Sequence, residues 1–432
     1  MKFGKAGWSL VLGLVGSGVM SVSGAFAQTG VYQPVNSVGY QQTTPQLAIP
    51  QTVAPAIAPQ QSVMSGTQEA ASCGSASCGC ASGRSCDGDP WTLFARNCEE
   101  PRFNIGGWFQ GGYHSQSNDL FNSQEDRFNL HQGWLFFEKE AKSENGEFGL
   151  GFRFDGMYGI DADDTQAFGN PANTWDLDPR FQRGGGYGWA IPQLYGEIAK
   201  GDWNVKVGHF YTLIGYEVVT APDNFFYSHS MTMYNSEPFT HTGAIASYSL
   251  NDDTTIYGGW TAGWDTGFDF TTGSNFLGGF STQLDPDIAF TYMTTFGDFG
   301  ARSANNDDGY SHSLVFDITL TDKLQYIIQS DLLRINSTGE DNFGINQYWI
   351  YQVNDCMSYG ARMEWWKGDD ITGYQPHGGL APTSSTSYYA STFGVNYKLG
   401  SNVTIRPEYR YDWSPALDYN VGYFGMDIIA TF

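Results

Sequence analysis

The chain has 432 residues and a formal net charge of −24, with 16% aromatic residues, only 15% charged residues and 54 glycines. The acidic balance argues against binding to nucleic acid, or to anionic head groups through a basic patch. After the first 27 residues no apolar run reaches the roughly 18 residues of a membrane-crossing helix, which excludes a helical membrane protein. Abundant aromatics and glycines with few charges favour many strands in a curved sheet.

The N-terminus has the three parts of a secretory signal. Lys2 and Lys5 precede an apolar core at residues 8–22, and Ala25-Phe26-Ala27 forms a small-x-small cleavage site. We expect residues 1–27 to be a signal peptide, cleaved after Ala27. A membrane anchor is less favoured, because the apolar run is short and interrupted by glycines.

Residues 28–72 are rich in Gln, Pro, Thr, Ser and Ala, with almost no charge and no alternation. This composition predicts a disordered linker. A spacer is the simpler interpretation, and contact with the cell wall is the alternative.

A cysteine-rich segment, expected to be periplasmic, follows at residues 73–102. Five of the six cysteines lie in it, and the sixth lies in a predicted tight turn near the other end of the chain: Cys73, Cys78, Cys80, Cys86, Cys98 and Cys356. In an exported chain this pattern favours disulfides over a zinc site, since it has no C-x2-C pair and no nearby His. Cys356 could tether the segment to the rim of a barrel or remain a free thiol.

From residue 103 onward, apolar and polar residues alternate with period 2. The clearest case is residues 403–413, where Val, Ile, Pro, Tyr and Trp alternate with Thr, Arg, Glu and Asp. Each such segment is about ten residues long, which is enough for a tilted strand to cross a bilayer. Residues 421–432 alternate too and end on Phe432, which resembles the closing strand of an outer-membrane barrel.

Short turns alternate with longer connections along this region. Turn-forming residues occur at 144–146, 200–202, 251–253, 285–287, 321–323, 354–356 and 400–402. Longer connections occur at 115–126, 161–188, 214–240, 265–275, 298–309, 335–344, 368–387 and 414–420. Seven turns and eight loops join sixteen strands, with both ends on the short-turn side.

Residues 103–432 are therefore predicted to form an all-β, transmembrane, antiparallel up-and-down β-barrel of about sixteen strands. A soluble sandwich or propeller is the alternative. It is disfavoured because the loop lengths alternate and because the face opposite the aromatics carries Arg, Glu, Asp and Asn instead of a second core.

Three stretches resemble the putative β-barrel porin-2, or OmpL-like, family. They are Gly106-Gly107-Trp108-Phe109-Gln110, residues 207–228 with Ala221-Pro222-Asp223-Asn224, and Thr242-Gly243. The Cys- and Gln/Pro-rich preface resembles planctomycete members. The resemblance implies an outer-membrane porin, in contact with outer-membrane lipid and the barrel assembly machinery, and it supplies no substrate. A homotrimer would follow only by analogy with large porins.

A channel needs a polar wall, and sixteen strands leave an aqueous lumen. Charged residues on the faces opposite the aromatic ones are the pore-lining candidates: Arg127, Arg153, Lys206, Arg362, Glu364, Arg406, Glu408 and Arg410. The simpler interpretation is that these neighbours pair with one another within the wall.

The connection 214–240 is too apolar to extend into water, so we expect it to pack inside the lumen as a constriction or against a neighbouring protomer. Glu217, Asp223, Asn224 and Glu237 are its candidate constriction residues, with the carboxylates expected to face basic wall residues.

We expect no catalytic site, metal site or cofactor. Asp161-Ala162-Asp163-Asp164 lacks the rest of a calcium-loop spacing and is expected to be a solvated acidic loop. The seven histidines are scattered without a nucleophile motif, which disfavours a barrel enzyme. The sequence predicts passive diffusion of small hydrophilic solutes or ions, and a structural or adhesive barrel is the alternative.

Overall fold

The computed structural model describes Cys86, residues 91–93 and residues 103–432 apart from 144–145, 172, 184, 272, 301–307, 337–338 and 369–384. The expected signal peptide, the linker and Cys73, Cys78, Cys80 and Cys98 lie outside these residues. Within them, no helix is both long enough and apolar enough to span a bilayer.

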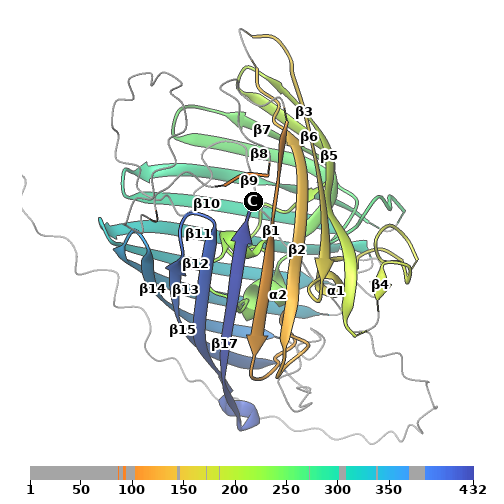
Figure 1. Ribbon diagram of the computed structural model, residues 1–432. Helices are drawn as coiled ribbons and strands as arrows, with labels where there is room; N and C mark the ends of the chain where they lie inside the picture. Colours follow the sequence, from red (N-terminus) through yellow and green to blue (C-terminus); the bar gives the residue numbers. More distant parts are fainter. Residues whose placement is uncertain are drawn as a thin grey trace, which may run out of the picture. The chain divides into compact units, whose positions relative to one another are not determined.

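One closed antiparallel sheet makes up the described chain (Figure 1). Its strands are β1 (Asn104–His114), β2 (Phe128–Lys139), β3 (Gly149–Gly159), β4 (Gln182–Arg183), β5 (Tyr187–Lys200), β6 (Trp203–Tyr211), β7 (Thr240–Ser249), β8 (Thr254–Thr261), β9 (Ser274–Asp285), β10 (Ile288–Asp298), β11 (Asp308–Thr321), β12 (Leu324–Ile335), β13 (Glu340–Asn354), β14 (Met357–Gly368), β15 (Thr386–Lys398), β16 (Val403–Ser414) and β17 (Tyr419–Thr431). The two-residue β4 pairs only with β5, inside a connection, so sixteen strands form the wall and the predicted number is confirmed.

The barrel closes where β17 pairs with β1. Trp108 lies opposite Thr431, and the backbone N–H of Gly107 donates to the carbonyl of Phe432 at 3.0 Å while the Phe432 N–H donates back at 2.9 Å. The pairing satisfies the backbone groups that an open edge strand would leave exposed. The alternating last strand thus closes the barrel as its sequence predicted.

The alternation of the sequence becomes the two faces of the wall. Outward-facing apolar side chains remain largely exposed, as for Phe109 at 56%, Leu150 at 60% and Tyr409 at 51%. Polar and charged side chains point inward and are mostly buried, as for Asp155 and Arg362, both 0% exposed. An apolar outside and a polar inside is the arrangement of a membrane barrel and not of a two-layer soluble sheet.

Short turns join the strands at one end and longer connections join them at the other, as predicted. The connections contain α1 (Ala162–Thr165), η1 (Ala221–Asp223), α2 (Met231–Ser236) and η3 (Pro415–Leu417). Two expected long connections, 335–344 and 414–420, are reduced to residues 336–339 and 415–418, because β13 begins at Glu340 opposite Ile335 and β17 begins at Tyr419 opposite Ser414.

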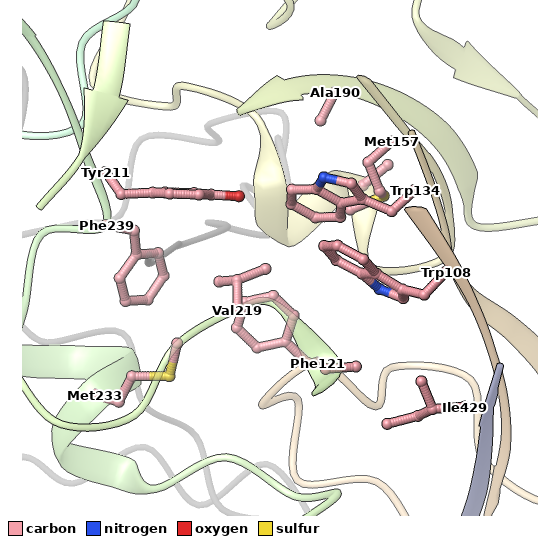
Figure 2. Close-up of a cluster of buried hydrophobic side chains, with 12 residues drawn as sticks. Trp108, Phe121, Trp134, Met157, Ala190, Tyr211, Val219, Met233, Phe239 and Ile429 are labelled. Carbon is pink, nitrogen blue, oxygen red and sulfur yellow. The ribbon is translucent and has the colours of Figure 1, made fainter. Parts of the chain in front are cut away.

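The largest apolar cluster lies between the wall and the connection that joins β6 to β7 (Figure 2). Trp108 and Trp134 stack on the wall side with ring centroids 4.7 Å apart. Val219, Met233 and Phe239 come from the connection. Apolar side chains of this connection are therefore buried inside the barrel.

Cys86 and Trp91 lie at the short-turn end of the barrel. A disulfide joins Cys86 to Cys356, with Cα atoms 5.5 Å apart. Nearby, the Trp91 N–H donates to Asn402 Oδ1 at 2.7 Å, and Asn402 Nδ2 donates to the Trp91 carbonyl at 2.8 Å. Trp91 also lies against Phe432 at 6.5 Å between ring centroids. Trp91 thus lies beside the strand that closes the barrel.

Candidate functional site

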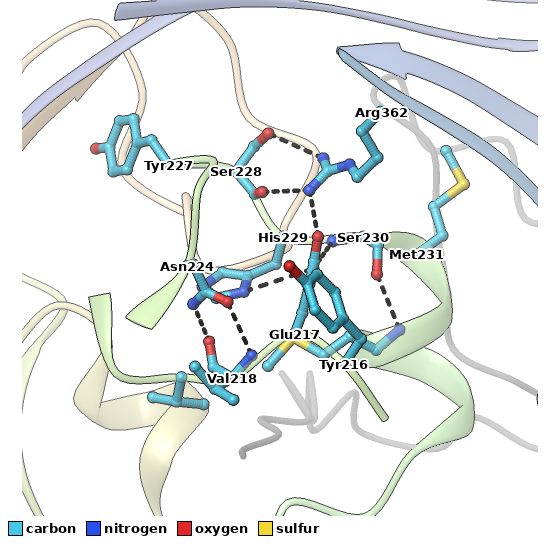
Figure 3. A network of polar contacts seen from close by, with 12 residues as sticks. Tyr216, Glu217, Val218, Asn224, Tyr227, Ser228, His229, Ser230, Met231 and Arg362 are labelled. Atoms are coloured by element: carbon cyan, nitrogen blue, oxygen red, sulfur yellow. Dashed lines mark hydrogen bonds and ion pairs between the residues drawn. The ribbon is translucent and has the colours of Figure 1, made fainter. Parts of the chain in front are cut away.

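Residues 212–239, here called the inner segment, connect β6 to β7 and bond to the inner face of the wall (Figure 3). Their polar partners lie on β2, β12, β13, β14 and β16. A segment with this many apolar side chains gains from leaving water, and a polar wall can satisfy its backbone groups. The sequence left two locations open, and the segment lies in the lumen.

Arg362 on β14 is the centre of the contact. Its Nη1 donates to Glu217 Oε1 at 2.6 Å and to the Ser228 carbonyl at 2.7 Å, and its Nη2 donates to Ser228 Oγ at 3.1 Å. On the wall itself, its Nε lies 2.7 Å from Glu364 Oε1. The guanidinium is 0% exposed, so its charge is balanced by two carboxylates within the protein and not by water.

Arg406 on β16 repeats this arrangement. It forms a bidentate pair with Asp427, at 3.0 Å from Nε and 2.6 Å from Nη2. Its Nη1 donates to the carbonyls of Ala221 at 2.8 Å and Asn224 at 2.5 Å. A fork of five donors can hold a wall carboxylate and a loop backbone together.

Arg410, two residues further on β16, pairs with Asp412 at 2.6 Å and donates to the carbonyl of His229. His229 is buried beside these guanidinium groups. Burial, reinforced by Arg362 and Arg406, lowers the pKa of His229 to about 3, so its imidazole is neutral at ordinary pH. The wall therefore presents its positive charge to carbonyl oxygens of the segment, which accept hydrogen bonds without adding a charge.

Wall carboxylates hold the amide groups of the same segment. Glu408 accepts the N–H groups of Tyr227 at 2.9 Å and Ser228 at 3.0 Å. Glu364 accepts the N–H of Met231, the first residue of α2, at 2.8 Å. A carboxylate at the beginning of a helix satisfies N–H groups that the helix leaves without partners.

Beyond β17 and β1 on the wall, His131 of β2 lies between two loops. Its Nδ1 is 2.7 Å from Asp161 Oδ1, and its Nε2 is hydrogen-bonded to the Tyr227 hydroxyl. The ring of His114 stacks on Tyr227 at 4.0 Å and covers it. The order carboxylate, imidazole, hydroxyl is that of a proton relay, but the hydroxyl here is buried under a neighbouring ring.

Glycines of the inner wall make room for the inner segment. A Cβ at Gly360 would lie 2.2 Å from a ring atom of Phe225, and one at Gly112 would lie 2.2 Å from the Tyr227 hydroxyl. Sequence reasoning assigned the glycines only to curvature. Glycine at an inward position of a strand was the available signal, since it marks the close approach of another group.

Two pore-lining candidates lie on a separate part of the inner wall. Arg153 pairs with Asp155 at 2.7 Å and with Glu138 at 3.1 Å. The Lys206 ammonium lies over the Tyr195 ring at 4.7 Å. Both face inward without contacting the inner segment.

Arg127 differs from the expectation of an inward-facing strand residue. β2 begins one residue later, at Phe128, and Arg127 is exposed, donating to Gln124 and to the Gly185 carbonyl at 3.2 Å. The alternation was extended one residue too far, because strand ends are set by pairing and not by pattern.

The candidates on the inner segment have varied partners. Asp223 accepts from Thr220 Oγ1 at 2.6 Å, and the Asn224 amide bonds to its own loop at Val218 and Thr220. The expectation that Glu237 faces a basic wall residue is wrong, since Glu237 lies beside Asp331 of β12. This acidic pair could not be foreseen because its members are far apart in the sequence.

The acidic run at 161–164 is also different from the solvated loop that was expected. Asp161 is buried against His131, and Asp164 accepts from the Tyr234 hydroxyl at 2.9 Å. Burial raises the pKa of Asp164 well above its usual range. The run packs the connection after β3 against the inner segment.

Solved structures resemble this fold. OprB of Pseudomonas putida has 12% sequence identity and a TM-score of 0.53, over 76% of this chain and 94% of that chain. The outer membrane channel DcaP of Acinetobacter baumannii has 11% identity and a TM-score of 0.50, over 76% and 97%. At such identities the likeness shows the barrel fold alone.

No curated protein sequence matches the chain. The sequence model of one family, described as putative beta-barrel porin-2, OmpL-like, matches residues 102–427. That range covers the whole wall except the end of β17. The chain therefore belongs to the β-barrel porin-2, OmpL-like family and is an outer-membrane porin.

Proposed function

We propose that this porin lets small hydrophilic solutes or ions diffuse passively, and that the inner segment sets the width of the path. The supporting observation is that guanidinium and carboxylate groups of the wall converge on the backbone of the segment. A sixteen-stranded barrel without such a segment would leave a wide aqueous lumen. Arg362, Glu364, Arg406, Glu408 and Arg410 then act as its supports, while Arg153 and Lys206 face the remaining lumen.

In this proposal, residues 1–27 direct export and are removed after Ala27. The aromatic outer face lies in outer-membrane lipid after insertion by the barrel assembly machinery, and a homotrimer is the assembly to test by native mass spectrometry. We assign no catalytic role to the Asp161, His131 and Tyr227 relay, because His114 covers the Tyr227 ring and each group is used in holding the loops.

The test is single-channel conductance in planar bilayers of protein refolded from residues 28–432. Deleting residues 217–236 should give larger open steps, because the deletion removes the groups that occupy the lumen. Unchanged steps in a folded deletion variant would rule out the constriction. A folded, heat-modifiable barrel without any steps in either protein would favour the structural or adhesive alternative.

Two point substitutions test the same role of the segment if the deletion variant does not fold. Gly360→Val places a side chain where the Phe225 ring now lies and should raise conductance by displacing the segment. Gly196→Val is the matched control, because a Cβ there meets no atom within 4 Å. Equal conductance of the two variants would contradict the proposed role of the segment.

A further inference from the structure

Two carboxyl groups meet where the inner segment joins β12. Gln329 Nε2 donates to Glu237 Oε1 and to Asp331 Oδ2, each at 2.5 Å. Both carboxyl groups are 0% exposed. Among the described residues, Glu237 Oε2 has no hydrogen-bond partner, and Asp331 has the Ser313 hydroxyl as its other neighbour.

The same wall residue holds both ends of the inner segment. Gln329 Oε1 accepts the Tyr216 N–H at 3.2 Å near the beginning of the segment, while its amide group holds Glu237 near the end. Gly215, with φ of +95°, passes so close that a Cβ would lie 1.9 Å from Glu237 Oε2. Gln329 thus holds both ends of the segment to β12, next to the contacts of Glu217 with Arg362 and of Phe239 with Asp265.

The groups packed around the pair supply no balancing cation. From the segment, Glu217 adds negative charge to the surroundings of the pair. Arg362 on β14 does not neutralise the pair, because it is bound to Glu217 and Glu364. β11 contributes the neutral Ser313, and β12 contributes Gln329. Asp265 faces this end of the segment and accepts the N–H groups of residues 239 and 240. Within the described part of the chain, no Lys, Arg or His is ion-paired with Glu237 or Asp331.

Two neighbouring carboxylates cannot both be ionised in a buried site without a cation. Burial and the Asp331 carboxylate together raise the pKa of Glu237 well above its usual range. A single proton between the two groups removes one charge and supplies the missing donor, as in other carboxyl pairs that share a proton.

We propose that Glu237 and Asp331 share one proton and that this proton latches the inner segment to β12, so that the segment is released as the pH rises. The latch would be closed below the ordinary carboxyl pKa of the released groups. It would weaken as the pH rises from that value toward the raised pKa of Glu237. With one proton involved, the release equilibrium shifts about tenfold per pH unit within that window.

The test measures hydrogen–deuterium exchange of residues 212–239 in the refolded full mature chain between pH 5 and pH 9, corrected for intrinsic exchange rates. The wild type should lose protection as the pH rises, by up to about tenfold per unit. Glu237→Gln keeps the shape and remains uncharged, so its protection should stay constant. Asp331→Asn is the second variant should the first fail to fold.

Asp252→Asn, in an exposed turn, is the control for loss of one charge and should follow the wild type. The same pH dependence in Glu237→Gln as in the wild type, or constant protection in the wild type, would overturn the latch. Restored protection at pH 9 on adding calcium chloride, but not choline chloride, would instead identify a cation site and also overturn it.

The effect of the latch on conductance rests on the proposed function. If the segment narrows the channel, alkaline pH should enlarge the open steps of the wild type and leave those of Glu237→Gln unchanged. A barrel that never conducts but loses segment protection with pH would support the latch and refute the channel. Open steps that change on deletion of residues 217–236 but not with pH would support the channel and refute the latch.

Discussion

At the scale of single residues, buried guanidinium groups connect the wall to the inner segment. Arg362, Arg406 and Arg410 each have at least one wall carboxylate and one loop carbonyl as partners. Such groups contribute little net stability over an apolar core, but removing one partner leaves an uncompensated charge. Their value lies in fixing one position of the segment.

Arg362→Ala should therefore destabilise the barrel strongly. Glu217 would remain buried without its cation, and Glu364 would keep only Arg410, at a cost of about 3–5 kcal/mol. The measurement is urea unfolding in detergent micelles followed by tryptophan fluorescence. Arg180→Ala is the control, because Arg180 is 85% exposed in its pair with Asp178 and an exposed pair of this kind contributes little to stability. Similar losses in the two variants would refute the structural role of the buried pair.

At the scale of elements, the long connections decide how the lumen is filled, and one disulfide joins Cys86 to Cys356 in a short turn. The strands were foreseeable because alternation and turn residues are local properties. The path of the inner segment was not, because its partners are spread over five strands. Gly360, which the Phe225 ring approaches closely, was the available signal in the sequence. A glycine at an inward position of a strand predicts the close approach of another group.

Cys356→Ser should release the N-terminal segment from the short-turn end. The bond closes a separation of 270 residues, and loss of such a constraint costs typically about 2–4 kcal/mol. Proteolysis before residue 103 should become faster, and the thermal transition of the oxidised protein should fall to that of the reduced wild type. If oxidised wild type and variant are cleaved equally fast, the tether has no role.

At the scale of the whole molecule, the inner face of the wall carries more acid than base. Its carboxyl groups are Glu138, Asp155, Glu197, Asp317, Asp331, Glu364, Glu408, Asp412 and Asp427. Its basic groups are Arg153, Lys206, Arg362, Lys398, Arg406 and Arg410. Although these carboxyl groups are buried, they outnumber the basic groups, so the formal charge of the inner face is negative.

We expect weak cation selectivity, measured as the reversal potential across a potassium chloride gradient at neutral pH. The preference should fall as salt is raised toward 1 M, where the screening length shrinks to about 3 Å. A preference for anions would contradict this expectation, because it would require arginine charges that are not neutralised by their carboxylate partners.

The sequence by itself determined the barrel. Period-2 alternation, turn chemistry and loop lengths specify sixteen strands, the lipid-facing side and the closing strand at residues 421–432, because each depends on residues that are close in the chain. It also identified seven charged wall residues, but it included Arg127 wrongly and missed Glu138, Glu197, Asp317, Asp331 and Asp427.

Only the tertiary structure decided which of these residues meet. Arg362 pairs with Glu217 across 145 positions, Cys86 with Cys356 across 270, and Glu237 lies beside Asp331 instead of a base. Each depends on how sixteen strands close and on where one connection turns inward. Such contacts are selected by burial and by compensation of charge in the folded chain, which no local pattern encodes.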